Sequence, residues 1–293
     1  MNLRDLQYLV ALAETRHFGR AAARCHVSQP TLSAQLKKLE AFLGVALIER
    51  RPRRIALTVA GGAVVERARR MLQDAEDIRA LARASQDPLA GQLKIGLIPT
   101  LGPYLLPRVM PRIAQSLPKL SLLLHEYQTA PLVQRVLDGE LDLAVLALPA
   151  DTRGLQTRPL FAETFLAAMP EEHRLASRRR LKPSDLAGEK VLLLEEGHCL
   201  REHALEVCAR VGTDEQDFRA TSLETLRQMV ASGLGITLLP RLAAEGPFAS
   251  ARGMVVRPFA PPAPSRVIGA AWRRSSSRAA AIAAVCDVIR KAG

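Results

Sequence analysis

Residues 18–44 read FGRAAARCHVSQPTLSAQLKKLEAFLG, and this stretch decides the fold of the N-terminal part of the chain. Its alanine-rich beginning predicts a short helix that permits close helix contact, and residues 26–30 predict the turn that follows. Ser28 is suited to cap a third helix that has Pro30 in its first turn. Leucines that recur every three or four residues predict that this helix continues to about Leu43 with one face in a core.

The polar face of the predicted third helix suits contact with DNA. Opposite its leucines, this helix carries glutamines, hydroxyl side chains and lysines, which fit the base-edge and phosphate contacts of a recognition helix in the major groove. Beyond Gly44, the basic run 49–54 lies between two short segments that predict strands, so we expect a wing that grips backbone phosphate. The candidate DNA-binding residues are Ser28, Gln29, Pro30, Thr31, Ser33, Gln35, Lys37, Arg50, Arg51, Arg53 and Arg54.

The charge of the chain is concentrated near its beginning. Residues 1–58 hold ten Lys and Arg against four Asp and Glu, so this fifth of the chain carries half of the net charge of +12. Such a basic segment is the electrostatic footprint of a module that binds a polyanion. Charge alone leaves open that the segment merely has a solvated basic face.

Two further helices are predicted around this core. Apolar residues at helical spacing predict a first helix that ends at about Thr15, and Thr58 is suited to cap a much longer helix that reaches about Ser85. The long helix has a narrow apolar stripe, which suggests pairing with a second copy of the chain. Residues 87–91 then break the helix and mark a domain boundary. The stripe consists of Val65, Ala68, Leu72, Ala75, Ile78 and Leu81.

The order of these motifs identifies a family. The pattern A-A-x4-V-S-Q-P-T-L-S-x-Q-L-K-x-L-E-x2-L-G, followed by a basic wing and a long helix, resembles the LysR-type transcriptional regulators. The resemblance over residues 1–88 implies a winged helix-turn-helix DNA-binding domain at 1–58 and a linker helix for dimerisation at 59–88.

The remainder of the chain predicts an α/β fold. Strands at 93–98, 120–126 and 141–146 alternate with helices, which is the βαβαβ pattern of a parallel sheet. A second run of elements begins at 165–169 and includes strands at 190–194 and 236–239 and a helix at 221–232.

These two runs predict a two-lobed regulatory domain, similar to periplasmic binding proteins, at residues 89–293. We expect lobe I at about 89–163 and 265–293 and lobe II at about 164–264. Ligands of such folds bind at the carboxyl ends of the strands, so a cleft is expected there.

The segment Glu195–Arg201, EEGHCLR, is the candidate chemical site of this domain. Cys199 follows His198 and precedes Arg201 by two residues. Cations close to a sulfur stabilise the thiolate, and the thiolate is the species that reacts with peroxides. The local sequence therefore predicts a cysteine with a stabilised thiolate.

A second cysteine, Cys208, follows nine residues after Cys199. If one continuous helix spans both, their Cα atoms lie roughly 13.5 Å apart on opposite faces. A disulfide requires a Cα separation of about 4.4–6.8 Å, so the pair can bond only if the segment unwinds. The spacing predicts a candidate two-state switch, and it leaves open that both cysteines are inert core residues.

With Phe218–Arg227, this segment resembles the peroxide-sensing OxyR branch of the LysR-type regulators. The resemblance implies that Cys199 is the peroxidatic cysteine, which becomes a sulfenic acid, and that Cys208 is the resolving cysteine. It also implies a peroxide pocket formed by Thr100, Thr129, His198, Arg201 and Arg266.

Several assignments retain alternatives. An isolated loop threonine is commonly a turn or cap residue, and Arg201 is equally suited to the surface. His125 and Glu126, at the end of a strand, are suited to support the pocket. Cys25 and Cys286 lack a cationic context and are interpreted as structural.

The resemblance implies a transcription factor that hydrogen peroxide activates through a Cys199–Cys208 disulfide and that controls antioxidant genes. We expect a cytoplasmic homotetramer, a dimer of dimers, that binds promoter DNA and RNA polymerase and is reset by a thiol reductant of the glutaredoxin or thioredoxin class. No cofactor, metal site or membrane association is expected, because the sequence contains no metal-ligand spacing and no long apolar run.

Two other functions remain open. In the first, the chain is a LysR-type regulator whose cleft binds an organic effector, and its cysteines are incidental. In the second, it is a thiol peroxidase, which would leave residues 1–58 without a role. We therefore expect a regulator and not an enzyme.

Overall fold

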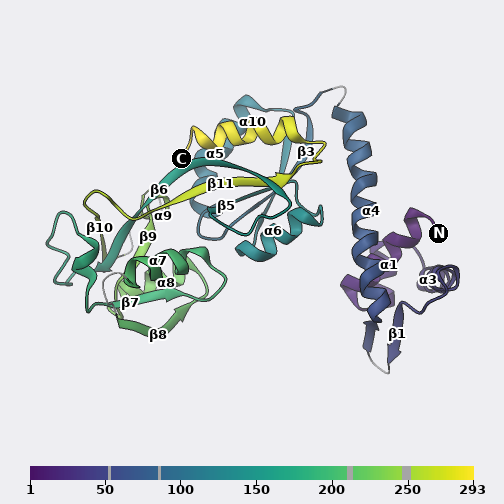
Figure 1. Ribbon diagram of the computed structural model, residues 1–293, viewed down its shortest axis with the longest axis horizontal. Helices are drawn as coiled ribbons and strands as arrows, with labels where there is room; N and C mark the ends of the chain where they lie inside the picture. Colours follow the sequence, from purple (N-terminus) through teal and green to yellow (C-terminus); the bar gives the residue numbers. More distant parts are fainter. Residues whose placement is uncertain (52–53, 85–86, 210–213, 246–251) are drawn as a thin grey trace. The chain divides into compact units, whose positions relative to one another are not determined.

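The computed structural model of the chain describes residues 1–51, 54–84, 87–209, 214–245 and 252–293 (Figure 1). The chain divides into two compact units, of which residues 1–86 form the first and nearly all of residues 87–293 the second. Within these ranges the side chains of residues 50, 51, 54, 77, 80, 81, 83, 84, 208, 209 and 214–218 are outside the description.

The first unit begins with three helices whose ends follow from local sequence: α1 (Leu3–Thr15), α2 (Phe18–Arg24) and α3 (Gln29–Leu43). The Ser28 hydroxyl accepts the backbone N–H of Thr31 at 3.2 Å, which confirms the predicted cap of α3. Gly44 ends α3 with a φ of 68°, a left-handed conformation that glycine adopts without strain.

An antiparallel hairpin, β1 (Ile48–Arg51) with β2 (Arg54–Leu57), follows the three helices. Its backbone confirms the two predicted strands, whereas the arginine side chains of the basic run lie outside the described residues. Thr58 then accepts the backbone N–H of Gly61 at 2.9 Å and caps α4 (Val59–Ala84), as predicted.

The burial of the apolar stripe of α4 changes along the helix. Val65 and Ala68 are buried, and α4 packs against α1 of the same unit. Further along, Met71 is 44% exposed and Ile78 is 67% exposed. The expectation that the whole stripe pairs with a second copy of the chain is therefore wrong for its first turns, which belong to the core of this unit.

The second unit contains a sheet in the order β10-β6-β11-β5-β3-β4, with β9 also paired to β6. Its lobe I combines the parallel strands β3 (Gly91–Leu97), β4 (Leu120–Glu126) and β5 (Leu143–Leu148). Helices α5 (Gly102–Ser116) and α10 (Ala279–Arg290) lie on one face of this sheet and α6 (Thr129–Leu137) on the other (Figure 1). This arrangement confirms the expected α/β layers.

One long strand continues from lobe I into lobe II. Strand β6 (Leu155–Pro170) pairs with β11 (Ser265–Arg273) up to Thr164 and with β9 (Thr237–Pro240) from Phe165 onward. The sequence predicted only residues 165–169 as a strand, because residues 155–164 contain Pro159 and lack regular alternation of apolar and polar residues. The change of partner at Thr164 is where the chain passes between the lobes.

Lobe II also contains several short helices and strands around the segment that carries Cys199. A separate pair of parallel strands, β7 (Lys190–Leu194) and β8 (Asp214–Ala220), adjoins helices α7 (Cys199–Ala209) and α8 (Leu223–Ala231). The remaining elements are a 3-10 turn at Pro183–Leu186, α9 (Arg241–Ala244) and β10 (Met254–Pro258). The sequence did not predict β8 or β10. Among the described residues, no helix combines the length and apolar character needed to cross a membrane.

Candidate functional site

The Cys199 segment begins where β7 ends. A tight turn follows Leu194, and Gly197 adopts a φ of 91°, which disfavours any residue with a side chain. A Cβ atom at Gly197 would approach Gln128 Oε1, just before α6, to 2.6 Å. This close approach places the first residue of α7, Cys199, beside the N-terminus of α6.

Cys199 is a free, half-buried thiol next to the Thr129 hydroxyl. Burial raises the pKa of the Cys199 thiol, whereas the Arg266 charge and the Thr129 hydroxyl oppose that rise. The Thr129 hydroxyl is itself buried, and its contact with the thiol falls short of a full hydrogen bond. Thr129 therefore brings a donor and an acceptor to the sulfur without a protein partner for them.

This environment corrects the prediction of a stabilised thiolate. The resting thiol has a raised pKa, because burial outweighs the nearby charges. The main cation acting on it is Arg266 on β11, which is distant in sequence, and not one of its sequence neighbours. Arg201 donates instead to the Leu194 carbonyl oxygen at 3.3 Å.

Arg266 is almost completely buried at 2% exposure and has defined partners on strand β6 and in the turn after β3. Its Nε donates to Glu163 Oε2 at 2.9 Å, and its Nη2 lies 2.8 Å from the same oxygen. Its Nη1 donates to the Thr100 hydroxyl at 2.9 Å and its Nη2 to the Thr100 carbonyl oxygen at 3.0 Å. Thr100 is thus engaged with Arg266, whereas Thr129 faces the thiol.

Two histidines adjoin Cys199. His198 is buried at 6% exposure in the turn before α7. His203, one helical turn after Cys199, has its Nδ1 atom 2.7 Å from the Cys199 carbonyl oxygen, and its ring packs against Phe165. These contacts attach the first turn of α7 to strand β6.

Cys208 lies near the opposite end of the same helix. Because α7 spans Cys199–Ala209, helix geometry separates the two cysteine Cα atoms by roughly 13.5 Å. The continuous helix that the sequence left as a condition is therefore present in this form of the chain, and a disulfide requires part of it to unwind. The side chain of Cys208 lies outside the described residues.

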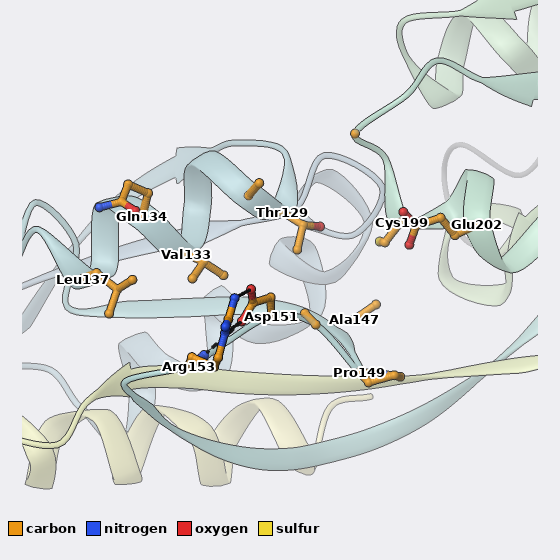
Figure 2. A pocket seen from close by; sticks show the side chains of 13 residues that line it. Thr129, Val133, Gln134, Leu137, Ala147, Pro149, Asp151, Arg153, Cys199 and Glu202 are labelled. Carbon is orange, nitrogen blue, oxygen red and sulfur yellow. Dashed lines mark hydrogen bonds and ion pairs between the residues drawn. The ribbon is translucent and has the colours of Figure 1, made fainter.

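A cleft of about 540 Å³ opens beside the thiol (Figure 2). Figure 2 shows Cys199 and Glu202 on one side and Thr129 on the other. Apolar side chains of α6 and of the segment after β5 line much of the remainder, with the exposed Asp151–Arg153 ion pair on the rim. Cys199 is among the residues that line this cleft. Its apolar lining consists of Ala130, Val133, Leu137, Ala147, Pro149 and Ala150.

The other described cysteines lie in inert surroundings. Burial raises the pKa of Cys286, in α10, to about 11. Burial also raises the pKa of Cys25, the residue after α2, although the charges of Arg24 and Arg4 oppose that change, so the prediction that Cys25 has no cationic context is wrong. Neither thiol adjoins the cleft. Among the described residues, no group of His, Cys, Asp and Glu is arranged to hold a metal ion.

The candidate DNA face of α3 is accessible in the first unit. Its N-terminal residues Gln29, Pro30 and Thr31 are exposed, as is Lys37, whereas Leu32, Leu36 and Leu39 are buried. Ser33 and Gln35 are half-buried. The Ser28 hydroxyl is already used to cap the helix.

Two residues of this site were not predicted from the sequence. Glu163 carries the carboxylate that pairs with Arg266, and His203 contacts the backbone of Cys199. His203 could have been found from its i, i+4 spacing to Cys199 on the predicted helix. Glu163 had no such local signal, because its partner lies 103 residues away.

Comparison with known proteins gives matches along the whole chain. Residues 3–62 match the bacterial regulatory helix-turn-helix protein of the lysR family, and residues 86–293 match the LysR substrate binding domain. The DNA-binding transcriptional dual regulator OxyR of Escherichia coli (strain K12) is 48% identical over 291 residues, which cover 99% of this chain and 95% of that protein.

Solved structures agree with this similarity. The full-length OxyR C199D variant from Pseudomonas aeruginosa aligns with a TM-score of 0.79 and 42% identity, covering 100% of this chain and 96% of that chain. A mutant of Corynebacterium glutamicum OxyR with bound hydrogen peroxide aligns with a TM-score of 0.68 and 35% identity, covering 99% and 92%.

Proposed function

Because the chain belongs to the LysR family of bacterial transcriptional regulators, and within it to the OxyR group, we propose that hydrogen peroxide activates it through a Cys199–Cys208 disulfide and that it controls antioxidant genes. The observation that carries this proposal is the meeting of the Cys199 thiol with Thr129 and the Arg266 charge at an open cleft. A second cysteine on the same helix completes the redox pair.

In the first step, the Cys199 thiolate attacks one oxygen of hydrogen peroxide. An S–O bond forms, the O–O bond breaks, and the other oxygen leaves as hydroxide, which takes up a proton to become water. The Thr129 hydroxyl is suited to bind the peroxide, since it can both donate and accept a hydrogen bond. Arg266 favours the thiolate, and Thr100 helps to hold Arg266. His198 and Arg201 complete the proposed pocket.

In the second step, the Cys208 thiolate attacks the sulfur of the Cys199 sulfenic acid. The S–O bond breaks, its oxygen leaves as water after protonation, and the disulfide forms. Unwinding of α7 is required to bring the two sulfurs together. Closure of a loop of about ten residues contributes roughly 2–3 kcal/mol to the oxidised form in the chain-entropy model.

The raised thiol pKa has a consequence for the pH dependence of oxidation. The reactive species is the thiolate, so a higher pKa means less thiolate at neutral pH. We expect the rate of Cys199 oxidation to rise about tenfold per pH unit through the range near pH 8.5 where ordinary cysteines titrate. Stopped-flow measurements at fixed ionic strength would check this, and a rate that levels off below about pH 7 would contradict the raised pKa.

For DNA binding, we propose that α3 enters the major groove and that the wing contacts phosphate. Substitution of the exposed Lys37 with alanine should reduce the slope of log affinity against log salt by about one, because one phosphate contact is lost. Gln29→Ala is the matched control: it should change sequence preference and leave the slope unchanged. Equal slopes for the wild type and Lys37→Ala would contradict the assignment. Arginines 50, 51, 53 and 54 should behave like Lys37.

The regulators of this group bind DNA and assemble as oligomers, and we propose a homotetramer that contains two dimers. The exposed part of the α4 stripe, around Ile78, supports pairing through this helix. We further propose that the assembly acts in the cytoplasm, where promoter DNA and RNA polymerase are present, and that a glutaredoxin- or thioredoxin-class reductant resets it. The chain then acts as a regulator and not as an enzyme.

The size of the cleft supports a second candidate function, in which a small organic effector binds there. A volume of about 540 Å³ lies within the usual range for small-molecule sites of about 300–1,000 Å³. A Cys199→Ser protein separates the two functions, because it would still respond to an organic effector but not to peroxide.

A further inference from the structure

Glu163, on β6, is a buried carboxylate that the proposed peroxide reaction leaves without a role. The residue is 3% exposed, and both of its carboxylate oxygens are occupied. Oε2 accepts the Arg266 Nε–H at 2.9 Å, and Oε1 accepts the backbone N–H of Leu242 at 2.9 Å. Arg266 lies on the strand that returns to lobe I, and Leu242 lies on α9 of lobe II. A single carboxylate thus joins the cation of the thiol site to lobe II.

The cation held by Glu163 lies near the thiol: the Arg266 guanidinium is 6.0 Å from the centroid of the Phe165 ring, and that ring packs against His203 of the Cys199 helix. Four groups in addition to burial influence Cys199: Arg266 from β11, Thr129 from α6, and Glu202 and the Leu200 N–H from its own helix. Arg266 is the strongest of the four. A carboxylate within 3 Å of its guanidinium offsets part of that positive charge in surroundings with little water to screen it.

We propose that Glu163 is a positioning residue for the reaction of Cys199 with peroxide, which fixes Arg266 in place and attenuates its charge at the thiol. The proposal rests on the function proposed above for Cys199. In this role Glu163 determines how reactive Cys199 is. Arg266 without a carboxylate partner would increase the thiolate fraction of Cys199, and Glu163 limits that increase.

The test is the pH dependence of Cys199 alkylation by iodoacetamide in Glu163→Gln, measured by mass spectrometry of the Cys199 peptide. The glutamine amide retains an acceptor oxygen but lacks the negative charge. The midpoint of the alkylation rate against pH should therefore be lower than in the wild type by about one pH unit. A fall of one unit raises the thiolate fraction about tenfold. The less basic thiolate is about threefold less nucleophilic, so peroxide oxidation at neutral pH should become about threefold faster.

Glu245→Gln is the matched control. It removes the same charge just after α9, from a carboxylate that pairs with Arg108 and Arg241 instead of Arg266. Its midpoint should equal that of the wild type. Equal midpoints for all three proteins would overturn the proposal, as would a rise in Glu163→Gln.

A conservative variant covers the case in which Glu163→Gln does not fold. Glu163→Asp keeps the charge but moves it away from Arg266 by one methylene, so its midpoint should fall by less than one unit. An unchanged midpoint there would also overturn the proposal. Alkylation does not involve peroxide, so failure of the peroxide function would appear separately, as a wild-type Cys199 that hydrogen peroxide does not oxidise.

Discussion

Replacement of Cys199 by serine is expected to abolish the response to hydrogen peroxide. Serine is close to cysteine in size and shape, so in the Cys199→Ser protein α7 and the cleft should remain folded. A hydroxyl is not an effective nucleophile toward peroxide here, and the oxidation step should slow by more than about a hundredfold. Stopped-flow oxidation and peroxide-dependent transcription in vitro would measure both consequences.

The matched variant is Cys208→Ser, which keeps the attacking thiol and removes the partner. It should consume one equivalent of peroxide and accumulate a Cys199 sulfenic acid that a dimedone adduct reveals. His198→Ala should slow the oxidation of Cys199 without preventing disulfide formation. A Cys199→Ser protein that reacts as fast as the wild type would refute the mechanism.

Of the proposed substitutions, Arg266→Met should cause the largest decrease in the free energy of unfolding. The change removes a buried cation and leaves Glu163 charged, buried and without its ion-pair partner. Breaking a buried pair in this way lowers the free energy of unfolding by about 3–5 kcal/mol. The Cys199 pKa should also rise further, because its strongest opposing charge is lost. Chemical denaturation and the pH profile of alkylation would measure the two effects.

Arg227→Met is the control for the loss of a buried arginine. Arg227 is 1% exposed and donates to the Ala243 carbonyl oxygen, but its nearest carboxylate, Glu224, reaches solvent. No buried carboxylate is left without its partner, so the loss should be smaller, about 1.5–3 kcal/mol, the value of hydrogen bonds that involve a charged group. Equal losses in the two variants would contradict a special role for the Arg266–Glu163 pair.

Local signals in the sequence were sufficient to predict the elements of the first unit. Ser28, Gly44 and Thr58 act on residues within a few positions of themselves, and each cap is found where it was predicted. For residues 199–208 the expectation from the sequence was only conditional: on a continuous helix the two cysteines would be far apart, and α7 is such a helix.

Contacts between residues that are far apart in the sequence could not be predicted from such local signals. Sequence neighbours suggested His198 and Arg201 as the cations that stabilise the thiolate, whereas the fold brings Arg266 to it and burial has the larger effect. The chain enters lobe II within β6, so no break in the sequence marks the passage, and the first ten residues of that strand were missed. Glu163 lies in that missed part.

The central claim is that oxidation joins the two ends of α7 in one disulfide. Peptide mapping by mass spectrometry, after treatment with one equivalent of hydrogen peroxide and alkylation without a reductant, tests it most directly. The account predicts a cross-linked peptide pair that contains Cys199 and Cys208, with Cys25 and Cys286 recovered as alkylated thiols. A peroxide-treated protein in which Cys199 remains an alkylated thiol, or is joined to Cys25 or Cys286 instead, would contradict it.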